Sequence, residues 1–429
     1  MVSAAGFIER QVAQIRQGGR AVLFGKIKRA LCIPHKLFLF ILAVPVVAAI
    51  HLIRPWLLVR WGELPGPRIG HFVGNTELYL CEQDAGINVP KQRHVDIFFI
   101  EQPICNPQLA KMWKRILHVW PGWILLSLRR VNRLIPGGAG HEIGDNTQND
   151  RDVHNLMERF SPHLKFTPEE EVRGEAGLRT MGIPVGAPFV CLIVRDSAYL
   201  DAHLSNDWSY HNYRDSVIQN YVLAAGELAD RGYFVIRMGA KVLEPITSPH
   251  PRVVDYATNG MRNDFMDIYL GANCRFCISV GTGFDAVPLV FRRPIVHVNI
   301  VPLGYLPTFR ERSISITKRH FSVLKNRELT LSEIFADGGG FDLKTSGYEE
   351  RRIRLVENTP EEIRDVVVEM AERLDGTWQQ EPDDDALQRR FWEIYSVHAQ
   401  DDPRKFRIHG QIRMRFGSQF LRSDRAFLK

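Results

Sequence analysis

Short apolar runs alternate with helical stretches along the second half of the chain. Runs of strand length occur at 189–194, 233–237, 276–280 and 295–299, and helical stretches lie between them at 217–230 and 264–272. The first run, F-V-C-L-I-V, has no polar residue and is therefore predicted to be buried on both faces of a parallel sheet. Repeated strand-then-helix order with glycines at strand ends predicts a doubly wound α/β domain.

A similar but weaker pattern precedes it, after the linker Pro65-Gly66-Pro67. We therefore expect an N-terminal α/β domain at 65–175 and a C-terminal α/β domain at 176–375, followed by a helix and a basic tail at 376–429. The last helix of the second domain should begin after Thr359, with a proline in its first turn, and run to Leu374.

The first 64 residues have a different character. Residues 37–53 form an apolar run without a formal charge, with basic residues on both flanks and Pro45 near its middle. Three interpretations stay open: a hairpin or helix at the membrane interface, one full span, and a buried soluble helix. The first two make this segment a membrane-associating one.

Charge divides the chain in the same way. The formal net charge is +6, but residues 1–60 carry nine Lys and Arg against Glu9, and residues 404–429 carry eight against Asp424. The remaining middle is acidic, which argues against nucleic acid as a partner and for an anionic membrane surface. The basic tail is expected to dock on the membrane or to return to the first domain.

Other features have ordinary interpretations. Cys274 and Cys277 form a lone C-x-x-C without a second pair, so we expect buried thiols rather than a zinc or redox site. The string Asp383-Asp384-Asp385 follows no predicted strand and is expected to be a solvated loop. We expect no metal site.

The glycine-rich segment after the run at 276–280 is the strongest candidate for chemistry. In open α/β sheets ligands bind at the carboxyl ends of the strands, and a tight glycine turn before a helix lets backbone N–H groups approach a phosphate. The alternative is a structural turn with a helix cap. The candidate ligand-binding residues here are Ser279, Gly281, Thr282, Gly283, Asp285 and, at the end of the next run, Asn299.

Arginines follow two other runs. Arg195 with Asp196, and Arg237 with Gly239, stand where a guanidinium group can bind a diphosphate and neutralise a leaving group. The alternative for Arg195 is a surface salt bridge with Asp196. Arg214, just before a predicted helix, is a further cation for the same place.

A base is expected beside the first strand of the N-terminal domain. Transfer of a group onto a hydroxyl requires a base that takes the proton of that hydroxyl. His71 and Glu77 are the candidates, and the alternative for both is a polar loop or cap.

Five motifs together resemble a family of bacterial glycosyltransferases found with surface-polysaccharide genes, and more distantly heptosyltransferases and fucosyltransferases. The motifs are R-I-G-H at 68, the strand end at Arg195, Y-R-D at 213, V-I-R-M-G at 235 and S-V-G-T-G-F-D at 279. The last differs from the S-N-D-S-G turn of heptosyltransferases, and I-V-R stands in place of the fucosyltransferase H-x-R. The resemblance implies a GT-B fold, in which two Rossmann-like domains face each other across a cleft, with a nucleotide-sugar donor bound by the C-terminal domain and no metal or other cofactor.

The sequence therefore predicts a glycosyltransferase at the cytoplasmic face of the inner membrane, using a nucleotide-sugar and a lipid-linked or polysaccharide acceptor. Two alternatives are kept: a sugar-nucleotide epimerase, and a non-catalytic scaffold of a polysaccharide assembly complex. The donor sugar, the stereochemistry and the oligomeric state stay open.

Overall fold

The computed structural model describes residues 4–144, 151–199, 208–399 and 410–429, which form two compact units. Unit 1 comprises Met1–Leu64, Pro90–Glu101 and Leu117–Asp145; unit 2 comprises Pro65–Val89, Gln102–Ile116 and Asn146–Lys429. The units differ from the predicted domains, in which residues 65–175 form one domain. Helices α2 (Ile69–Asp84) and α3 (Pro107–Lys114) belong to unit 2, because they pack against its helices α9 (Ala286–Val290) and α8 (Asp264–Asn273).

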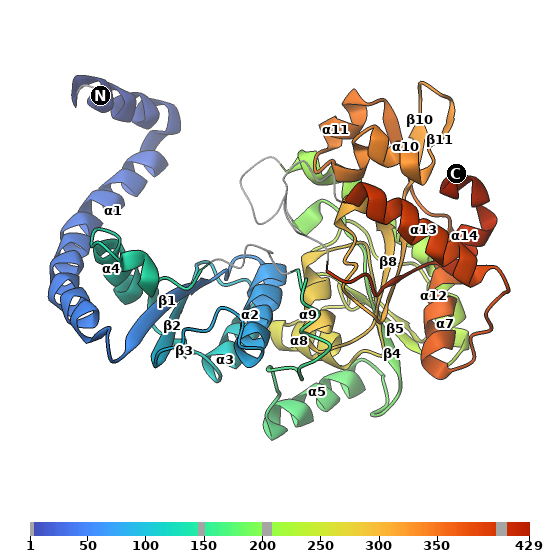
Figure 1. Ribbon diagram of the computed structural model, residues 1–429, viewed down its shortest axis with the longest axis horizontal. Helices are drawn as coiled ribbons and strands as arrows, with labels where there is room; N and C mark the ends of the chain where they lie inside the picture. The colour runs from blue at the N-terminus through green and yellow to red at the C-terminus, as the bar shows by residue number, and fades with distance from the viewer. Residues whose placement is uncertain (1–3, 145–150, 200–207, 400–409) are drawn as a thin grey trace. The chain divides into compact units, whose positions relative to one another are not determined.

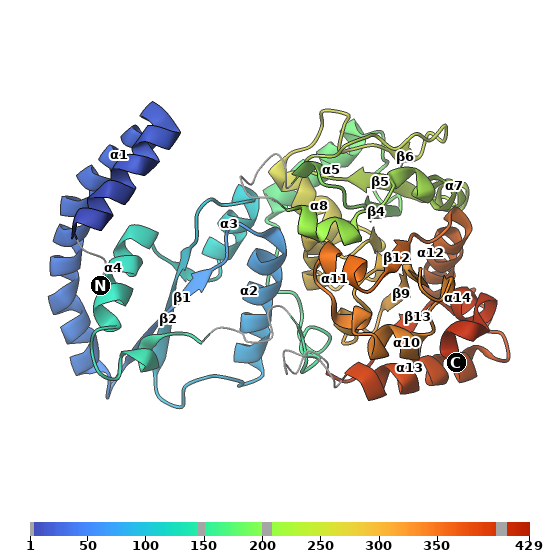
Figure 2. The same ribbon diagram turned by 90° about the horizontal axis from the view of Figure 1, so that it is seen from above.

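Unit 1 is built on a small parallel sheet of strands in the order β1-β2-β3. The elements of the unit are α1 (Ala4–Ile53), β1 (Leu58–Leu64), β2 (His94–Ile100), β3 (His118–Val119), α4 (Gly122–Asn132) and η1 (Gly138–His141). Helices α1 and α4 lie side by side (Figures 1 and 2). Their common core contains Ala43 and Val47 of α1, Leu125 and Leu128 of α4, and Phe99 of β2.

Helix α1 is long but not continuous. Gly19 has non-helical backbone angles, and Pro34 and Pro45 lie inside the helix, where each removes a helix hydrogen bond. Among the residues that the structure describes, no helix is both long enough and apolar enough to cross a bilayer. The alternative of a full span at 37–53 is therefore not met.

Unit 2 contains a seven-stranded, wholly parallel sheet in the order β13-β9-β8-β7-β4-β5-β6. Unit 2 also contains a three-stranded antiparallel sheet in the order β11-β10-β12. The strands are β4 (Phe189–Ile193), β5 (Phe234–Met238), β6 (Val253–Val254), β7 (Cys277–Ser279), β8 (Ile295–Ile300), β9 (Ser313–Thr317), β10 (Arg319–Ser322), β11 (Arg327–Glu328), β12 (Ile353–Val356) and β13 (Arg415–Phe416). The helices not yet named are α5 (Pro168–Thr180), α7 (Val222–Asp230), α10 (Leu331–Ala336), α11 (Thr345–Glu350), α12 (Pro360–Asp375), α13 (Asp384–Ala399) and α14 (Ser418–Ser423).

Both faces of the large sheet are covered, as the apolar run of β4 predicted. Val190 and Leu192 face a core that contains side chains of α7 and α12, whereas Cys191 faces a second core formed with α5 and α8. The strands accordingly lie between these helix pairs in Figure 1. Helix α12 begins after Thr359, whose side chain accepts a hydrogen bond from Glu362 N, and this confirms the predicted capped helix.

The C-terminal residues are part of unit 2, which corrects the expectation of a tail that docks elsewhere. Residues 410–429 add strand β13 to the sheet edge beside β9 and bury Phe416, Phe420 and Phe427. Arg422 and Arg425 form ion pairs with Asp384 (2.7 Å) and Asp383 (2.6 Å), so the acidic string is a partner of the tail and Asp384 is buried rather than solvated. Arg404, Lys405 and Arg407 of this tail lie outside the described residues.

The two cysteines of the C-x-x-C motif are buried thiols, as predicted. Cys274 and Cys277 are free, buried thiols, with Cys277 inside β7. Burial raises the pKa of Cys277 well above its usual value, so the thiol is protonated at neutral pH.

Candidate functional site

Strands β7, β4 and β5 are neighbours in the sheet, so their carboxyl ends lie side by side. The bend at 280–283 follows β7, Arg195 follows β4, and Gly239 follows β5. This strand-end position is where open parallel sheets bind ligands. The candidate site of unit 2 is built from these three chain segments.

The bend is held from within by Ser279. Its hydroxyl oxygen accepts hydrogen bonds from the N–H groups of Gly281 (3.1 Å) and Thr282 (3.4 Å), and it donates to Asp285 Oδ2 (3.2 Å). These two amides are therefore already paired, and Ser279 and Asp285 support the bend from within. Their direct contact with a donor stays a prediction.

A buried charge network stands behind Ser279. His297 Nε2 lies 3.7 Å from Asp285 Oδ2 and 3.2 Å from Nη1 of Arg310. Burial alone raises the pKa of Asp285, but the hydrogen bond from His297 and the charge of Arg310 outweigh it, so the pKa lies below its usual value. The carboxylate is therefore ionised and fixes the Ser279 hydroxyl in its donating orientation.

The bend requires glycine at two positions for different reasons. Gly281 has a φ of 77°, and an added Cβ there would lie 2.7 Å from Ile300 Cδ1. Gly283 contacts the first turn of α2, where an added Cβ on Gly70 would lie 3.0 Å from Gly283 Cα. The Thr282 hydroxyl is buried and makes no hydrogen bond with any described residue.

One guanidinium group contacts the bend, and a second is linked to it through Asp215. Arg214, at the end of η2 (Ser209–Arg214), donates to the carbonyl oxygen of Gly281. Nη1 of Arg195 lies 3.2 Å from Oδ1 of Asp215, the residue next to Arg214, but neither terminal nitrogen of Arg195 donates a hydrogen bond within the described part of the chain. The ion partner of Arg195 is thus Asp215, and not Asp196 as in the alternative interpretation.

A third cation was not predicted. Lys318, buried, donates from Nζ to the carbonyl oxygen of Asp215 (2.5 Å). Burial lowers the pKa of Lys318, and Asp215 and Glu357 oppose that effect. Lys318 directly follows strand β9, so the rule that located Arg195 applies to it as well.

Arg237 is not joined to the bend by any contact between described residues. It lies within β5, its side chain is 1% exposed, and Nη1 is 3.9 Å from Asp255 Oδ1 while Nη2 donates to the Glu244 carbonyl (3.3 Å). Asp196 accepts hydrogen bonds from Ala198 N and Leu243 N, so it shapes the loops above β4 and β5. At Gly239 an added Cβ would lie 2.5 Å from Val242 Cγ1, so this glycine allows the same loop to close.

Asn299 has a structural role, while its predicted contact with a donor stays a prediction. It is buried in the left-handed region (φ 55°), and its amide group donates to Ser216 Oγ and Tyr221 OH while its carbonyl oxygen accepts from Asn358 N (2.6 Å). Every polar atom of the side chain is engaged.

The two base candidates on α2 differ. His71 is half-buried on the first turn of α2, one residue after Gly70, and its Nδ1 lies 3.4 Å from Asn75 Oδ1. Glu77 is 0% exposed, and Arg292 Nη2 lies 2.6 Å from its Oε1. This burial and pairing disfavour Glu77 as a base, whereas His71 stays beside the bend.

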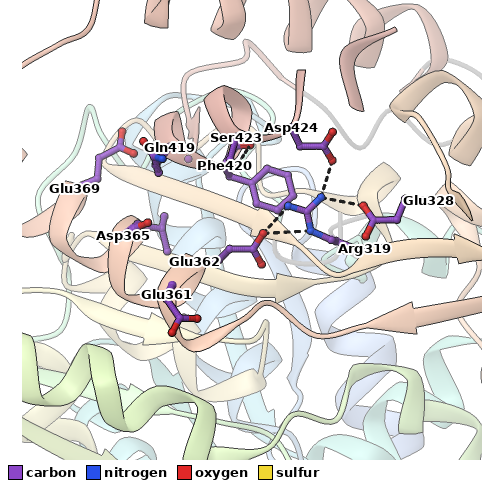
Figure 3. Close-up of a pocket in the computed structure, with 12 residues that line it drawn as sticks. Arg319, Glu328, Glu361, Glu362, Asp365, Glu369, Gln419, Phe420, Ser423 and Asp424 are labelled. Atoms are coloured by element: carbon purple, nitrogen blue, oxygen red, sulfur yellow. Dashed lines mark hydrogen bonds and ion pairs between the residues drawn. The ribbon is translucent and has the colours of Figure 1, made fainter. Parts of the chain in front are cut away.

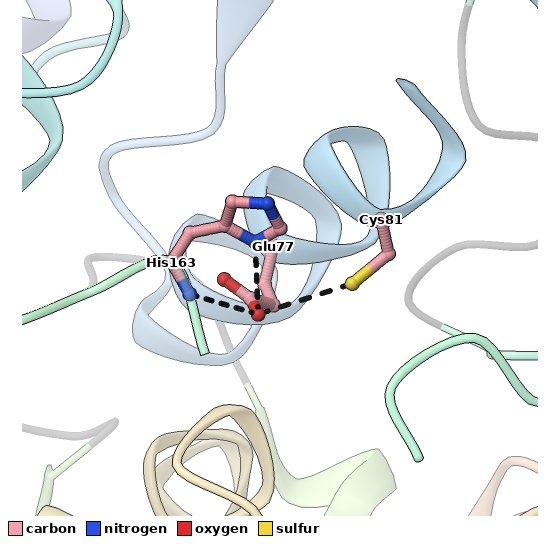
Figure 4. A group of neighbouring side chains, drawn as sticks. All are labelled: Glu77, Cys81 and His163. Carbon is pink, nitrogen blue, oxygen red and sulfur yellow. Dashed lines mark hydrogen bonds and ion pairs between the residues drawn. The ribbon is translucent and has the colours of Figure 1, made fainter. Parts of the chain in front are cut away.

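Glu77 belongs to a cluster with Cys81 and His163 (Figure 4), whose ligand atoms lie within 4.8 Å of one another. His163 Nδ1 is 3.2 Å from Glu77 Oε1, which raises the pKa of His163. Burial, reinforced by Glu77, raises the pKa of the Cys81 thiol to about 12. Because Arg292 is paired with Glu77, it supplies the positive charge that a metal ion would bring to this cluster.

Unit 2 also has a cavity of about 400 Å³ between α12 and α14 (Figure 3). Arg319 at its centre forms ion pairs with Glu362 (2.5 Å), Glu328 (3.0 Å) and Asp424 (2.5 Å), and stacks on Phe420. These ion pairs join the C-terminal segment to β10 and α12, so the cavity has a structural explanation.

A first prediction concerns the contact of α2 with the bend. Gly70→Ala is expected to lower the free energy of unfolding by about 1–2 kcal/mol, because the new Cβ meets backbone atoms of Gly283. Gly226→Ala in α7, where an added Cβ meets nothing within 4 Å, is expected to raise it by about 0.5–1 kcal/mol. Chemical denaturation measures both, and equal stabilisation by the two alanines would refute the contact.

Comparison with known proteins gives only distant likenesses. No protein-family model matches the chain, and no curated protein is similar to it in sequence. Among solved structures, the chain is similar to an ADP-heptose lipopolysaccharide heptosyltransferase II of E. coli (TM-score 0.38, 13% identity, 61% of this chain and 90% of that chain). It is also similar to a family 9 glycosyl transferase of Veillonella parvula (TM-score 0.40, 11%, 74% and 96%) and to E. coli heptosyltransferase WaaC (TM-score 0.29, 13%, 60% and 93%). Likenesses of this extent establish no activity for the chain.

Proposed function

We propose that the protein is a glycosyltransferase of the GT-B kind that binds the diphosphate of a nucleotide-sugar at the bend of unit 2. One observation carries this proposal: on the carboxyl edge of a parallel sheet, Arg214 donates to the Gly281 carbonyl oxygen, and Arg195 follows the neighbouring strand and pairs with Asp215, the residue next to Arg214. Two guanidinium groups beside a tight glycine bend are suited to a group with two negative charges.

Charge in the site supports the same conclusion. Arg195, whose side chain is 11% exposed, has two terminal nitrogens that donate to no described residue, and Thr282 has a buried hydroxyl in the same situation. Unpaired buried N–H and O–H groups are costly, and phosphate oxygens would satisfy them. Cations held in place before the reaction can stabilise the charge that develops on a departing nucleoside diphosphate, and we propose that they do so without a metal ion.

We further propose His71 as the group that takes the proton from the acceptor hydroxyl. Its helix begins against Gly283, and histidine is the side chain that most often acts as a general base. The acceptor that we propose is a lipid-linked or polysaccharide glycan, an assignment that rests on the resemblance of the sequence motifs.

We also propose that unit 1 docks on the cytoplasmic face of the inner membrane. Helix α1 turns Ala43 and Val47 inward, whereas a row of large apolar side chains is exposed on its other faces. This apolar face consists of Leu37, Phe38, Ile41, Leu42, Val44 and Val46. Basic residues flank the segment in the sequence, and this combination suits the interface of an anionic bilayer.

The function is tested by measuring thermal stability with UDP-, GDP- and ADP-sugars and with CMP-sugars, followed by product analysis. A transferase is stabilised by one class of nucleotide-sugar and releases the nucleotide only when a glycan acceptor is added. An epimerase converts the sugar without an acceptor, and a scaffold is stabilised by none of the donors. Either of the last two results would overturn the proposed activity.

The membrane proposal predicts a loss of binding when the apolar face is made polar. Replacing Leu37, Phe38, Ile41 and Leu42 by serine should lower partitioning onto phosphatidylglycerol vesicles at least about tenfold, because each apolar chain removed from water contributes roughly 1.5–3 kcal/mol. Co-sedimentation with vesicles measures it. The matched control replaces Val172 and Val185, which are exposed on unit 2, and should bind vesicles like the unchanged protein; equal binding of the two variants contradicts the assignment.

A further inference from the structure

His211 stands among aromatic rings beside the two site arginines. It lies in η2, three residues before Arg214, and its ring stacks on Trp208 (5.9 Å between centroids, 10° between planes) and contacts Tyr210 (4.0 Å). Its Nδ1 is buried and has no hydrogen-bond partner among the described residues. The rings fix the imidazole, and its free nitrogen has no structural task that the described residues reveal.

Three guanidinium groups act on this imidazole. Burial lowers the pKa of His211, and the charges of Arg214, Arg195 and Arg68 lower it further, to about 4. Arg68 comes from the start of α2 and lies over the Trp208 ring at 5.9 Å. The ring is therefore neutral at pH 7, because a fourth positive charge at this position is unfavourable.

The other titratable groups around His211 do not cancel the positive charge of the three arginines. Asp215 is ion-paired with Arg195 and accepts from Lys318 through its carbonyl oxygen. Tyr213, with a pKa raised mainly by burial, and Tyr348 behind it stay neutral at the pH of the cell. The described charges near His211 therefore leave an excess of positive charge.

We propose that His211 is a further binding residue for the diphosphate and that it takes up one proton when the diphosphate binds. The inference rests on the proposed function. A diphosphate esterified at both ends brings two negative charges, which offset the arginines and make the imidazolium form favourable. The proton comes from solvent, no covalent bond of the ligand changes, and the resulting N–H⁺ donates a charge-assisted hydrogen bond to a phosphate oxygen.

The direction of the pH dependence follows. The pKa of the free site is about 4 and that of the occupied site is higher, so between these two values binding is accompanied by proton uptake. Affinity should therefore rise as the pH falls from 8 to 6. If His211 had only a structural role, its protonation would not change when the ligand binds.

Calorimetric titration in buffers of different ionisation enthalpy tests the proposal. The probes are UDP-glucose, GDP-mannose and ADP-glucose, whose diphosphates have no group that titrates between pH 6 and 8. At pH 6 we expect an uptake of about 0.5–1 proton per bound ligand. His211→Gln should reduce the uptake to near zero and weaken binding about tenfold at pH 6, with a smaller difference at pH 8.

The matched control is His154→Gln, because His154 is exposed on unit 2 and should leave the uptake unchanged. Binding without proton uptake, or uptake that persists in His211→Gln, overturns the role of His211 while leaving the proposed function in place. If none of the three probes binds, the donor site fails and this inference fails with it.

Discussion

Arg195→Ala is expected to abolish the stabilisation of the protein by nucleotide-sugars and to weaken diphosphate binding by roughly 2–5 kcal/mol, which is about 30-fold to several thousandfold. The physical reason is that Arg195 is mostly buried, and its terminal nitrogens donate to none of the described residues. A phosphate oxygen can satisfy these donors without breaking an internal hydrogen bond. Calorimetry with nucleoside diphosphates measures the change.

Two controls accompany this variant. Arg195→Lys keeps the charge but loses the two-pronged geometry, so it should retain part of the affinity. Arg179→Ala removes an exposed arginine of α5 that pairs only loosely with Glu175 (3.7 Å), and it should bind like the unchanged protein. Unchanged affinity in Arg195→Ala, with the fold intact, would remove Arg195 from the site.

Arg292→Met is expected to lower the free energy of unfolding by about 3–5 kcal/mol, because it leaves the fully buried carboxylate of Glu77 without its closest cation. Arg292 also donates to the carbonyl oxygen of Phe160 (3.0 Å). The substitution therefore also loosens the contact of α2 with the segment that contains Phe160. Its φ of 61° is equally strained for arginine and methionine, and the backbone therefore contributes little to the difference. Chemical denaturation measures the loss.

The matched control for this variant is an exposed pair. Arg231→Met removes an arginine that bridges Glu227 and Glu372 at the surface of α7, and it should cost no more than about 1 kcal/mol. A second variant, Glu77→Leu together with Arg292→Met, should recover much of the lost stability because no buried charge remains. A loss below about 1 kcal/mol in Arg292→Met alone would show that the buried pair is not what holds α2 in unit 2.

Local patterns predicted the sheet of unit 2 well. The apolar run of β4 indicated burial on both faces, and its alternate side chains indeed enter two different cores. The strand-end rule located Arg195 and the bend at 281–283, because the carboxyl ends of parallel neighbours must adjoin. Lys318 obeys the same rule and was missed because the polar serines of β9 obscure the apolar pattern of that strand.

What failed depended on partners distant in the sequence. Asn299 lies near the end of strand β8, yet Ser216, Tyr221 and Asn358 engage its side chain, and no local pattern indicates them. Glu77 was a candidate base until its pairing with Arg292, more than two hundred residues later, was visible. The charge of the C-terminal tail indicated a membrane, but three arginines of its described part, Arg415, Arg422 and Arg425, pair with the acidic string at 383–385.

The most direct test of the account compares the binding of nucleoside diphosphates with that of the corresponding nucleosides to the unchanged protein by calorimetry. The account places the binding energy in the guanidinium groups of Arg195 and Arg214, so one diphosphate should bind at least about a hundredfold more tightly than its nucleoside, and this preference should shrink as salt is added. Equal affinity for nucleoside and diphosphate, or no binding of any diphosphate, would contradict it.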